Sequence, residues 1–137
     1  SVSKRPTLII VCNSTALLVD LKILGSFFIL FIMSVVTLSD QNDLHQMLKS
    51  SNSLCILYFT AAWCGPCKMI SPIIDQYAQQ FHNCLFIKID VDQLKSLTEQ
   101  FNVSKMPTFL CIKNNTIKDR MEGANKDRLL QLIQSNL

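Results

Sequence analysis

The sequence Cys-Gly-Pro-Cys at residues 64–67 lies between an apolar run and an amphipathic segment. The run Leu54–Thr60 is nearly all apolar, which predicts a short strand that is covered on both faces. The segment Met69–Phe81 has apolar residues at helical spacing, which predicts a helix. The cysteine pair therefore lies at a helix N-terminus, where unpaired backbone N–H groups and the helix dipole favour negative charge. A cysteine in this position ionises more easily, and the thiolate is the nucleophilic form.

The spacing of the two cysteines suits a redox switch better than a structural link, because the loop that they would close is too short to add much stability. The alternative is half of a zinc site, which needs more ligands, such as a second cysteine pair or two histidines. The chain has no second pair of this kind, and His45 and His82 have no partner at ligand spacing. The other cysteines are isolated at positions 12, 55, 84 and 111. We therefore expect no metal, and we expect Cys55 and Cys111 to be buried, whereas Cys84 begins its strand and could be exposed.

The residues around the pair, Trp63 to Lys68, resemble the active-site signature of the thioredoxin family. Three further features agree at matching spacing: a proline inside the following helix, a sequence like the family's cis-proline loop, and a glycine like the one at the rim of the site. They are Pro72, Met106-Pro107-Thr108 and Gly123-Ala124. The resemblance covers residues 33–137, which is close to a whole thioredoxin, and it does not cover residues 1–32.

The predicted elements alternate as β-α-β-α-β-α-β-β-α, which favours a mostly parallel sheet with helices on both faces. Asn114 and Asn115 suit the turn of the last hairpin because asparagine tolerates the left-handed conformation. Periodicity alone indicates only a single α/β domain, whereas the resemblance implies the thioredoxin fold with a central mixed five-stranded sheet. The expected strands are 34–38, 54–60, 84–90, 108–113 and 116–121; the expected helices are 40–49, 69–81, 93–101 and one capped by Asn125 that buries Leu129, Leu130, Ile133 and Leu137.

The resemblance implies a protein-disulfide reductase that works by dithiol–disulfide exchange. Cys64 would be the nucleophile, and Cys67, one turn into the helix and more buried, would resolve the mixed disulfide. Gly65 permits the tight turn, and Pro66 stiffens it at an early helical position. In this family a Gly-Pro pair accompanies a reducing potential, about −270 mV for thioredoxin itself. No bound cofactor is expected, since the resemblance implies electrons from NADPH through thioredoxin reductase, with disulfide-containing client proteins as the other partners.

The surface on which client proteins dock is expected to combine Trp63, next to the cysteine pair, with residues from later parts of the chain. The resemblance implies that the Met106 backbone pairs with an extended client segment, as an added strand would. Pro107, which has no N–H, would lie beside the sulfur atoms and discourage metal capture. Trp63, Gly123 and Ala124 would form the apolar rim. The alternatives are that Trp63 belongs to the core and that Pro107 is a simple turn proline.

One position departs from the family pattern. Lys88 matches a lysine that some thioredoxins place behind the resolving cysteine, where its partner is a buried aspartate. In this chain Tyr58, six residues before Cys64, takes the aspartate's position. An unperturbed tyrosine ionises near pH 10, so it is a poor base at neutral pH. We expect resolution by Cys67 to be slower or to rely on water, unless Tyr58 only fills space and forms a hydrogen bond.

Residues 1–32 form an apolar N-terminal extension. The uncharged window Ile23–Leu38 has 16 residues, whereas a membrane-spanning helix needs about 20. The last five of these residues are needed for the first strand, so a membrane anchor conflicts with the fold. The extension has three interpretations. It is a leader, a signal peptide headed by Lys4 and Arg5, or an artefact from an untranslated region that precedes a true start at Met33. We expect a cytoplasmic protein, or a secreted or endoplasmic-reticulum protein if residues 1–32 act as a signal peptide.

The charge balance gives no reason to expect a nucleic-acid partner. The chain has a net charge of +3, but residues 33–137 carry ten Lys or Arg and nine Asp or Glu. A net charge of +1 does not provide the basic surface that nucleic acid requires. We expect a monomer. Two alternatives to the reductase remain: a binding module whose redox state gates a partner, and a lumenal thioredoxin-like oxidoreductase.

Overall fold

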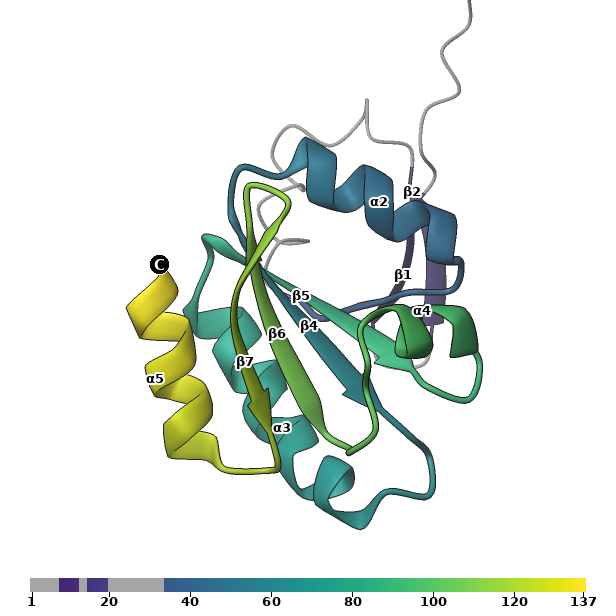
Figure 1. The fold of residues 1–137 in the computed structure, drawn as a ribbon. Coiled ribbons are helices and arrows are strands. Elements are labelled where there is room, and N and C mark those ends of the chain that lie inside the picture. The colour runs from purple at the N-terminus through teal and green to yellow at the C-terminus, as the bar shows by residue number, and fades with distance from the viewer. Residues whose placement is uncertain (1–7, 13–14, 20–33) are drawn as a thin grey trace, which may run out of the picture.

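The computed structural model describes residues 8–12, 15–19 and 34–137 (Figure 1). Residues 34–137 contain a five-stranded sheet in the order β3-β5-β4-β6-β7. Strands β3, β5 and β4 are parallel, whereas β6 runs antiparallel to β4 and β7 runs antiparallel to β6. This arrangement confirms the expected mixed sheet. The strands are β3 (Val36–Thr37), β4 (Leu54–Thr60), β5 (Cys84–Asp90), β6 (Thr108–Lys113) and β7 (Thr116–Glu122).

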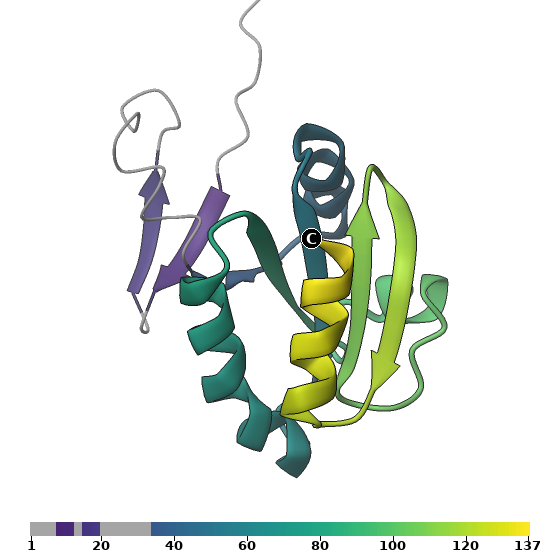
Figure 2. The same ribbon diagram turned by 90° about the vertical axis from the view of Figure 1, so that its left-hand side faces the viewer.

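Four helices cover the two faces of this sheet (Figures 1 and 2). Buried side chains of α5 and most of those of α3 pack with one set of strand residues, and those of α2 and α4 pack with the other set, which also includes Cys67 at the start of α3. The central strand β4 is buried along its whole length and supplies Leu57 and Phe59 to one cluster and Ile56 and Tyr58 to the other. The helices are α2 (Gln41–Ser50), α3 (Gly65–Gln80), α4 (Lys95–Gln100) and α5 (Lys126–Asn136).

Capping residues explain where α2 and α3 begin. The Asp40 side chain accepts a hydrogen bond of 2.9 Å from the backbone N–H of Asn42, and this cap starts α2 where the sequence predicts it. Helix α3 begins at Gly65, four residues before the predicted start, because Cys64 is its N-cap and a proline follows in the first turn. The first turn of α3 therefore contains the second cysteine of the pair.

Helix α5 corrects part of the predicted core. Asn125 caps it as expected, by accepting hydrogen bonds from two backbone N–H groups of the first turn. Its buried residues are Leu129, Leu132 and Ile133. Leu137 was expected to be buried, but it lies beyond the last helical residue and is 46% exposed. The helix ends one residue too early to turn this side chain toward the sheet.

The hairpin between β6 and β7 confirms the predicted turn. Asn114 and Asn115 have φ values of 52° and 58°. Both lie in the left-handed region that a type I′ hairpin turn requires. The turn reverses the chain so that β7 becomes the edge strand of the sheet.

Two strands in the N-terminal extension were not predicted from the sequence. Strands β1 (Leu8–Cys12) and β2 (Thr15–Val19) pair antiparallel in a separate two-stranded sheet. The proposed start at Met33 and the rest of the extension lie outside the described residues. Within the described ranges, no helix has both the length and the apolar character needed to cross a bilayer.

Candidate active site

The two cysteines of the motif are joined by a disulfide, with their Cα atoms 5.3 Å apart. They lie just beyond the carboxyl end of β4, where the chain enters α3. The backbone N–H of Cys67 donates a hydrogen bond of 3.2 Å to Sγ of Cys64. The same N–H can therefore stabilise negative charge on this sulfur when the disulfide is reduced.

Both sulfur-bearing residues are buried in this oxidised form, whereas the residues around them are exposed. Cys64 is 5% exposed and Cys67 is 2% exposed. The expected greater burial of Cys67 is thus present but small. Gly65 and Pro66, which separate the cysteines, are exposed. An approaching partner therefore meets this turn before it meets either sulfur.

The loop before β6 lies at the same end of the sheet. The Met106–Pro107 peptide bond is cis, as the resemblance implies. Met106 packs against the core cluster that contains both cysteines. The backbone N–H of Gly123 donates a hydrogen bond of 2.9 Å to the Pro107 carbonyl, which ties the end of β7 to this loop. Ala124, the next residue, is exposed.

A groove of about 830 Å³ runs along this end of the sheet. It brings together three of the predicted docking residues, Trp63, Met106 and Gly123, although they lie up to 60 positions apart in the sequence. The charged residues of the same groove were not predicted from the sequence. Its remaining lining residues are Ser104, Lys105, Arg120, Glu122 and Arg128.

Trp63 is a surface residue, so the alternative that placed it in the core is wrong. Its side chain is 66% exposed, and its indole Nε1–H donates a hydrogen bond of 2.9 Å to Oδ2 of Asp92. Asp92 was not predicted from the sequence. The backbone N–H of Asp92 donates in turn to Oδ1 of Asp90, the last residue of β5. The sequence signal that could have identified Asp92 is this aspartate pair at the carboxyl end of β5. Carboxyl ends of parallel strands meet at one edge of the sheet, so the pair could have been expected to lie near the cysteines that follow β4.

Tyr58 lies in the core and contacts the first turn of α3. It is 2% exposed, and its ring stacks on Phe109 with the centroids 5.2 Å apart. Its hydroxyl donates a hydrogen bond of 3.1 Å to the carbonyl oxygen of Cys67. Burial raises the pKa of Tyr58, and the negative charge of Asp75 raises it further, although a hydrogen bond with Thr60 opposes both effects. The phenol therefore stays protonated at neutral pH.

Lys88 pairs in register with Tyr58 across β4 and β5 and is half-buried. In the part of the chain that the structure describes, no carboxylate forms an ion pair with it. Its charge acts on Asp75 of α3: burial raises the pKa of this carboxyl group, and Lys88 partly offsets that rise. The carboxylate whose pKa Lys88 influences is thus Asp75 on α3, since position 58 holds a tyrosine.

The three remaining described cysteine side chains are all buried thiols. Cys84 is 0% exposed, which corrects the expectation that it could reach solvent. Burial raises the pKa of Cys111 to about 12 and raises those of Cys55 and Cys84 as well. Across residues 34–137, no cluster of three His, Cys, Asp or Glu side chains is arranged to hold a metal ion.

Comparisons with known proteins agree with this geometry. The Thioredoxin family model matches residues 34–135. Thioredoxin H1 of Arabidopsis thaliana is 39% identical over 101 residues, which cover 74% of this chain and 89% of the relative. A Thioredoxin H-type of Oryza sativa subsp. indica is 46% identical over 85 residues, which cover 62% of this chain and 70% of the relative.

Solved structures give the same result. The crystal structure of thioredoxin NaTrxh from Nicotiana alata superposes with a TM-score of 0.72 at 37% identity, covering 74% of this chain and 91% of the other. Fasciola hepatica thioredoxin has the same TM-score at 33% identity, covering 74% and 98%. The chain therefore belongs to the thioredoxin family, and it is a thioredoxin-type disulfide reductase with an active-site cysteine pair.

Proposed function

We propose that Cys64 is the nucleophile and Cys67 the resolving thiol in the reduction of disulfides in other proteins. The observation that carries this assignment is the position of Cys64 as the N-cap of α3, with the Cys67 N–H directed at its sulfur. This N–H and the helix dipole both favour a thiolate at Cys64. Cys67 has the position of the second thiol, in the first turn of the helix and within disulfide distance.

The exchange takes two steps. The Cys64 thiolate attacks one sulfur of the client disulfide, which forms a mixed disulfide and releases one client thiolate that takes a proton from water. Cys67 then loses its proton and attacks Sγ of Cys64, which releases the second client thiol. Two electrons pass to the client, and the Cys64–Cys67 disulfide is the oxidised product. Reduction of this disulfide by thioredoxin reductase, with electrons from NADPH, returns the protein to its starting state.

The client segment binds in extended form along the loop at Met106. The backbone of Met106 pairs with the segment, and Pro107 follows it without an N–H group of its own. Trp63, Gly123 and Ala124 form the rim against which the segment packs. The groove that connects Trp63, Met106 and Gly123 supports this placement.

Four residues tune the reactivity of the pair. Gly65 and Pro66 form the first turn of α3 between the sulfurs. Tyr58 bonds the Cys67 carbonyl and Lys88 pairs with Tyr58 in register. Tyr58 provides no base because its raised pKa keeps it protonated. Cys67 therefore loses its proton to water, and resolution is slower than in relatives that have an aspartate at this position.

The catalytic domain comprises residues 33–137, and residues 1–32 take no part in the reaction. The family match to residues 34–135 supports this division. The domain acts as a monomer in the cytosol. The three buried free thiols support a reducing compartment, and the only disulfide among the described residues is the one in the active site.

An insulin-reduction assay with NADPH and a thioredoxin reductase tests the proposal. We expect turnover by the natural protein, none by Cys64→Ser, and accumulation of a mixed disulfide with Cys67→Ser. The alternative, a binding module gated by its redox state, would bind partners without turnover. If Cys67→Ser forms no mixed disulfide through Cys64, the assignment of the two roles is wrong.

A further inference from the structure

The groove beside the active site carries more positive charge than the domain around it. Of its eight lining residues, three are cationic, Lys105, Arg120 and Arg128, and one is anionic, Glu122. The groove thus has a net charge of +2, whereas residues 33–137 together have +1. A concave surface with an excess of one sign of charge concentrates ligands of the opposite sign.

The single carboxylate does not neutralise these cations. One oxygen of Glu122 lies 3.8 Å from Nζ of Lys105, and the other lies 3.5 Å from Nη2 of Arg120. Arg120 is also held by two backbone carbonyls, since it donates to Phe101 O at 2.7 Å and to Asn102 O at 2.8 Å. Arg120 and Glu122 therefore form part of the wall of the groove, and their charges offset one another.

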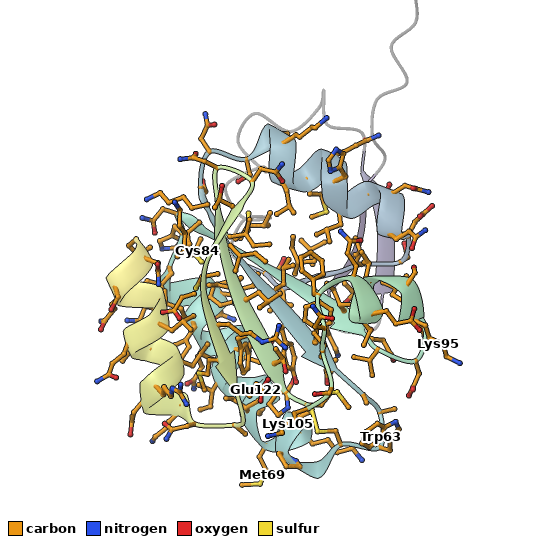
Figure 3. The ribbon with its side chains drawn as sticks, viewed as in Figure 1. Trp63, Met69, Cys84, Lys95, Lys105 and Glu122 are labelled. Carbon is orange, nitrogen blue, oxygen red and sulfur yellow. A yellow bond between two sulfur atoms is a disulfide. The ribbon has the colours of Figure 1, made fainter. Side chains whose placement is uncertain are left out.

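Lys105 and Arg128 remain available to a ligand. The Lys105 side chain is 76% exposed and keeps only the long contact with Glu122. Arg128 is exposed at the start of α5, and among the described residues no carboxylate forms an ion pair with its guanidinium. Figure 3 shows Lys105 and Glu122 side by side at the end of the sheet that carries Trp63, while Lys95 lies apart from them.

From this arrangement we propose that Lys105 and Arg128 select client segments that carry Asp or Glu close to the reducible cysteine. The inference rests on the proposed function, because it concerns the segment that the groove holds during exchange. Lys105 directly precedes Met106, whose backbone is the proposed pairing edge. An extended chain rises about 3.3 Å per residue and alternates its side chains, so a residue two positions from the client cysteine lies about 7 Å away on the same side. That spacing brings its carboxylate within reach of a flexible lysine or arginine in the groove.

Peptide substrates that differ only in flanking charge provide the test. Each peptide has one cysteine, linked by a disulfide to neutral N-acetylcysteinamide, with Glu, Gln or Lys two positions before and after that cysteine. Single-turnover reduction by the reduced protein is followed by chromatography at low ionic strength. We expect the Glu peptide to react about three- to tenfold faster than the Lys peptide, with the Gln peptide between them. The ratio should fall toward one at about 0.5 M salt.

Charge-changing variants assign the preference to the two residues. Lys105→Glu combined with Arg128→Glu should reverse the preference between the Glu and Lys peptides. Lys105→Gln combined with Arg128→Gln should abolish it without adding repulsion toward Glu122. Lys95→Glu combined with Lys118→Glu is the matched control, because it makes the same change in net charge at exposed positions outside the groove. This control should keep the natural ratio.

Two results would overturn the inference. One is equal reduction of the Glu and Lys peptides by the natural protein, and the other is a control variant that changes the ratio as much as the groove variant does. Either result is consistent with the proposed reductase function, because the peptides are still reduced. Failure of every form of the protein to reduce any of the peptides would instead contradict the proposed function.

Discussion

The hydroxyl of Tyr58 donates a hydrogen bond of 3.1 Å to the carbonyl oxygen of Cys67. This bond links the central strand β4 to the first turn of α3, and it lies in the core, where Tyr58 is 2% exposed. The position at which the family resemblance implies a buried aspartate thus holds a neutral hydrogen-bond donor. Tyr58 bonds the backbone of Cys67, the proposed resolving cysteine, and has no basic group to offer the Cys67 thiol.

Tyr58→Phe should lower the free energy of unfolding by about 1–2 kcal/mol, because a buried carbonyl loses a partner while the stack on Phe109 remains. Urea unfolding of the oxidised protein measures the change. Tyr77→Phe is the matched control, since the Tyr77 hydroxyl bonds Lys126 O in an exposed position. We expect that control to stay within about 0.5 kcal/mol of the natural protein. Equal losses in the two variants would contradict the role given to the buried bond.

Tyr58→Asp should speed resolution by Cys67, because it supplies a carboxylate where the natural protein has only a protonated phenol. General-base assistance can reach 10²-fold or more, but loss of the aromatic stack lowers the gain, so we expect about tenfold. The fraction of enzyme trapped as mixed disulfide during insulin turnover measures the effect. Tyr58→Phe serves as the control without a base. If the folded Tyr58→Asp protein leaves both turnover and trapped fraction unchanged, slow resolution is not caused by Tyr58.

The buried thiols should make the fold sensitive to alkali. The folded state keeps Cys111 protonated up to a pKa of about 12, whereas the unfolded chain ionises near pH 9. The native state therefore binds more protons between these values, so the free energy of unfolding falls as pH rises, by up to about 1.4 kcal/mol per pH unit for this group. Urea unfolding between pH 7 and pH 11 should show a plateau up to about pH 8 and then a decline. Cys111→Ala should decline less steeply, and an equal slope would contradict this explanation.

Asp92 should hold the indole of Trp63 against the active-site rim. Trp63 is the only tryptophan in the chain, so its fluorescence reports this site directly. Asp92→Ala removes the acceptor at 2.9 Å, and we expect faster local motion of the ring and a two- to fivefold loss in client reduction. Time-resolved anisotropy measures the motion. Asp92→Asn keeps an acceptor oxygen and should retain most of the natural behaviour; unchanged anisotropy in Asp92→Ala would contradict the role of this bond.

The strands could be predicted from local sequence patterns, whereas their order in the sheet was implied only by the family resemblance. The apolar run 54–60 is buried at every position, and the Asn114-Asn115 turn adopts the conformation that asparagine favours. Periodicity was less informative at helix ends. A cysteine is not a usual N-cap, so the start of α3 was placed four residues late, and the early end of α5 leaves Leu137 exposed.

The composition of the site could be predicted only in part, because the groove joins residues that the topology brings together. The cysteine pair was predicted from its spacing and its place before a helix, whereas Met106-Pro107 was identified through the family resemblance. No local pattern connects Lys105 with Arg128, 23 positions later, or Trp63 with Asp92, 29 positions later. Strands β1 and β2 were missed because the apolar N-terminal stretch suited a leader equally well.

Differential alkylation of the reduced protein tests the central assignment most directly. Fully reduced protein is treated at pH 7 with a limiting amount of iodoacetamide, and the modified cysteines are identified by peptide mapping. Among the five cysteines whose side chains the structure describes, we expect Cys64 to take up nearly all of the label, Cys67 to take up little, and the three buried thiols to react only after unfolding. Equal labelling of Cys64 and Cys67, or preferential labelling of Cys67, would contradict it.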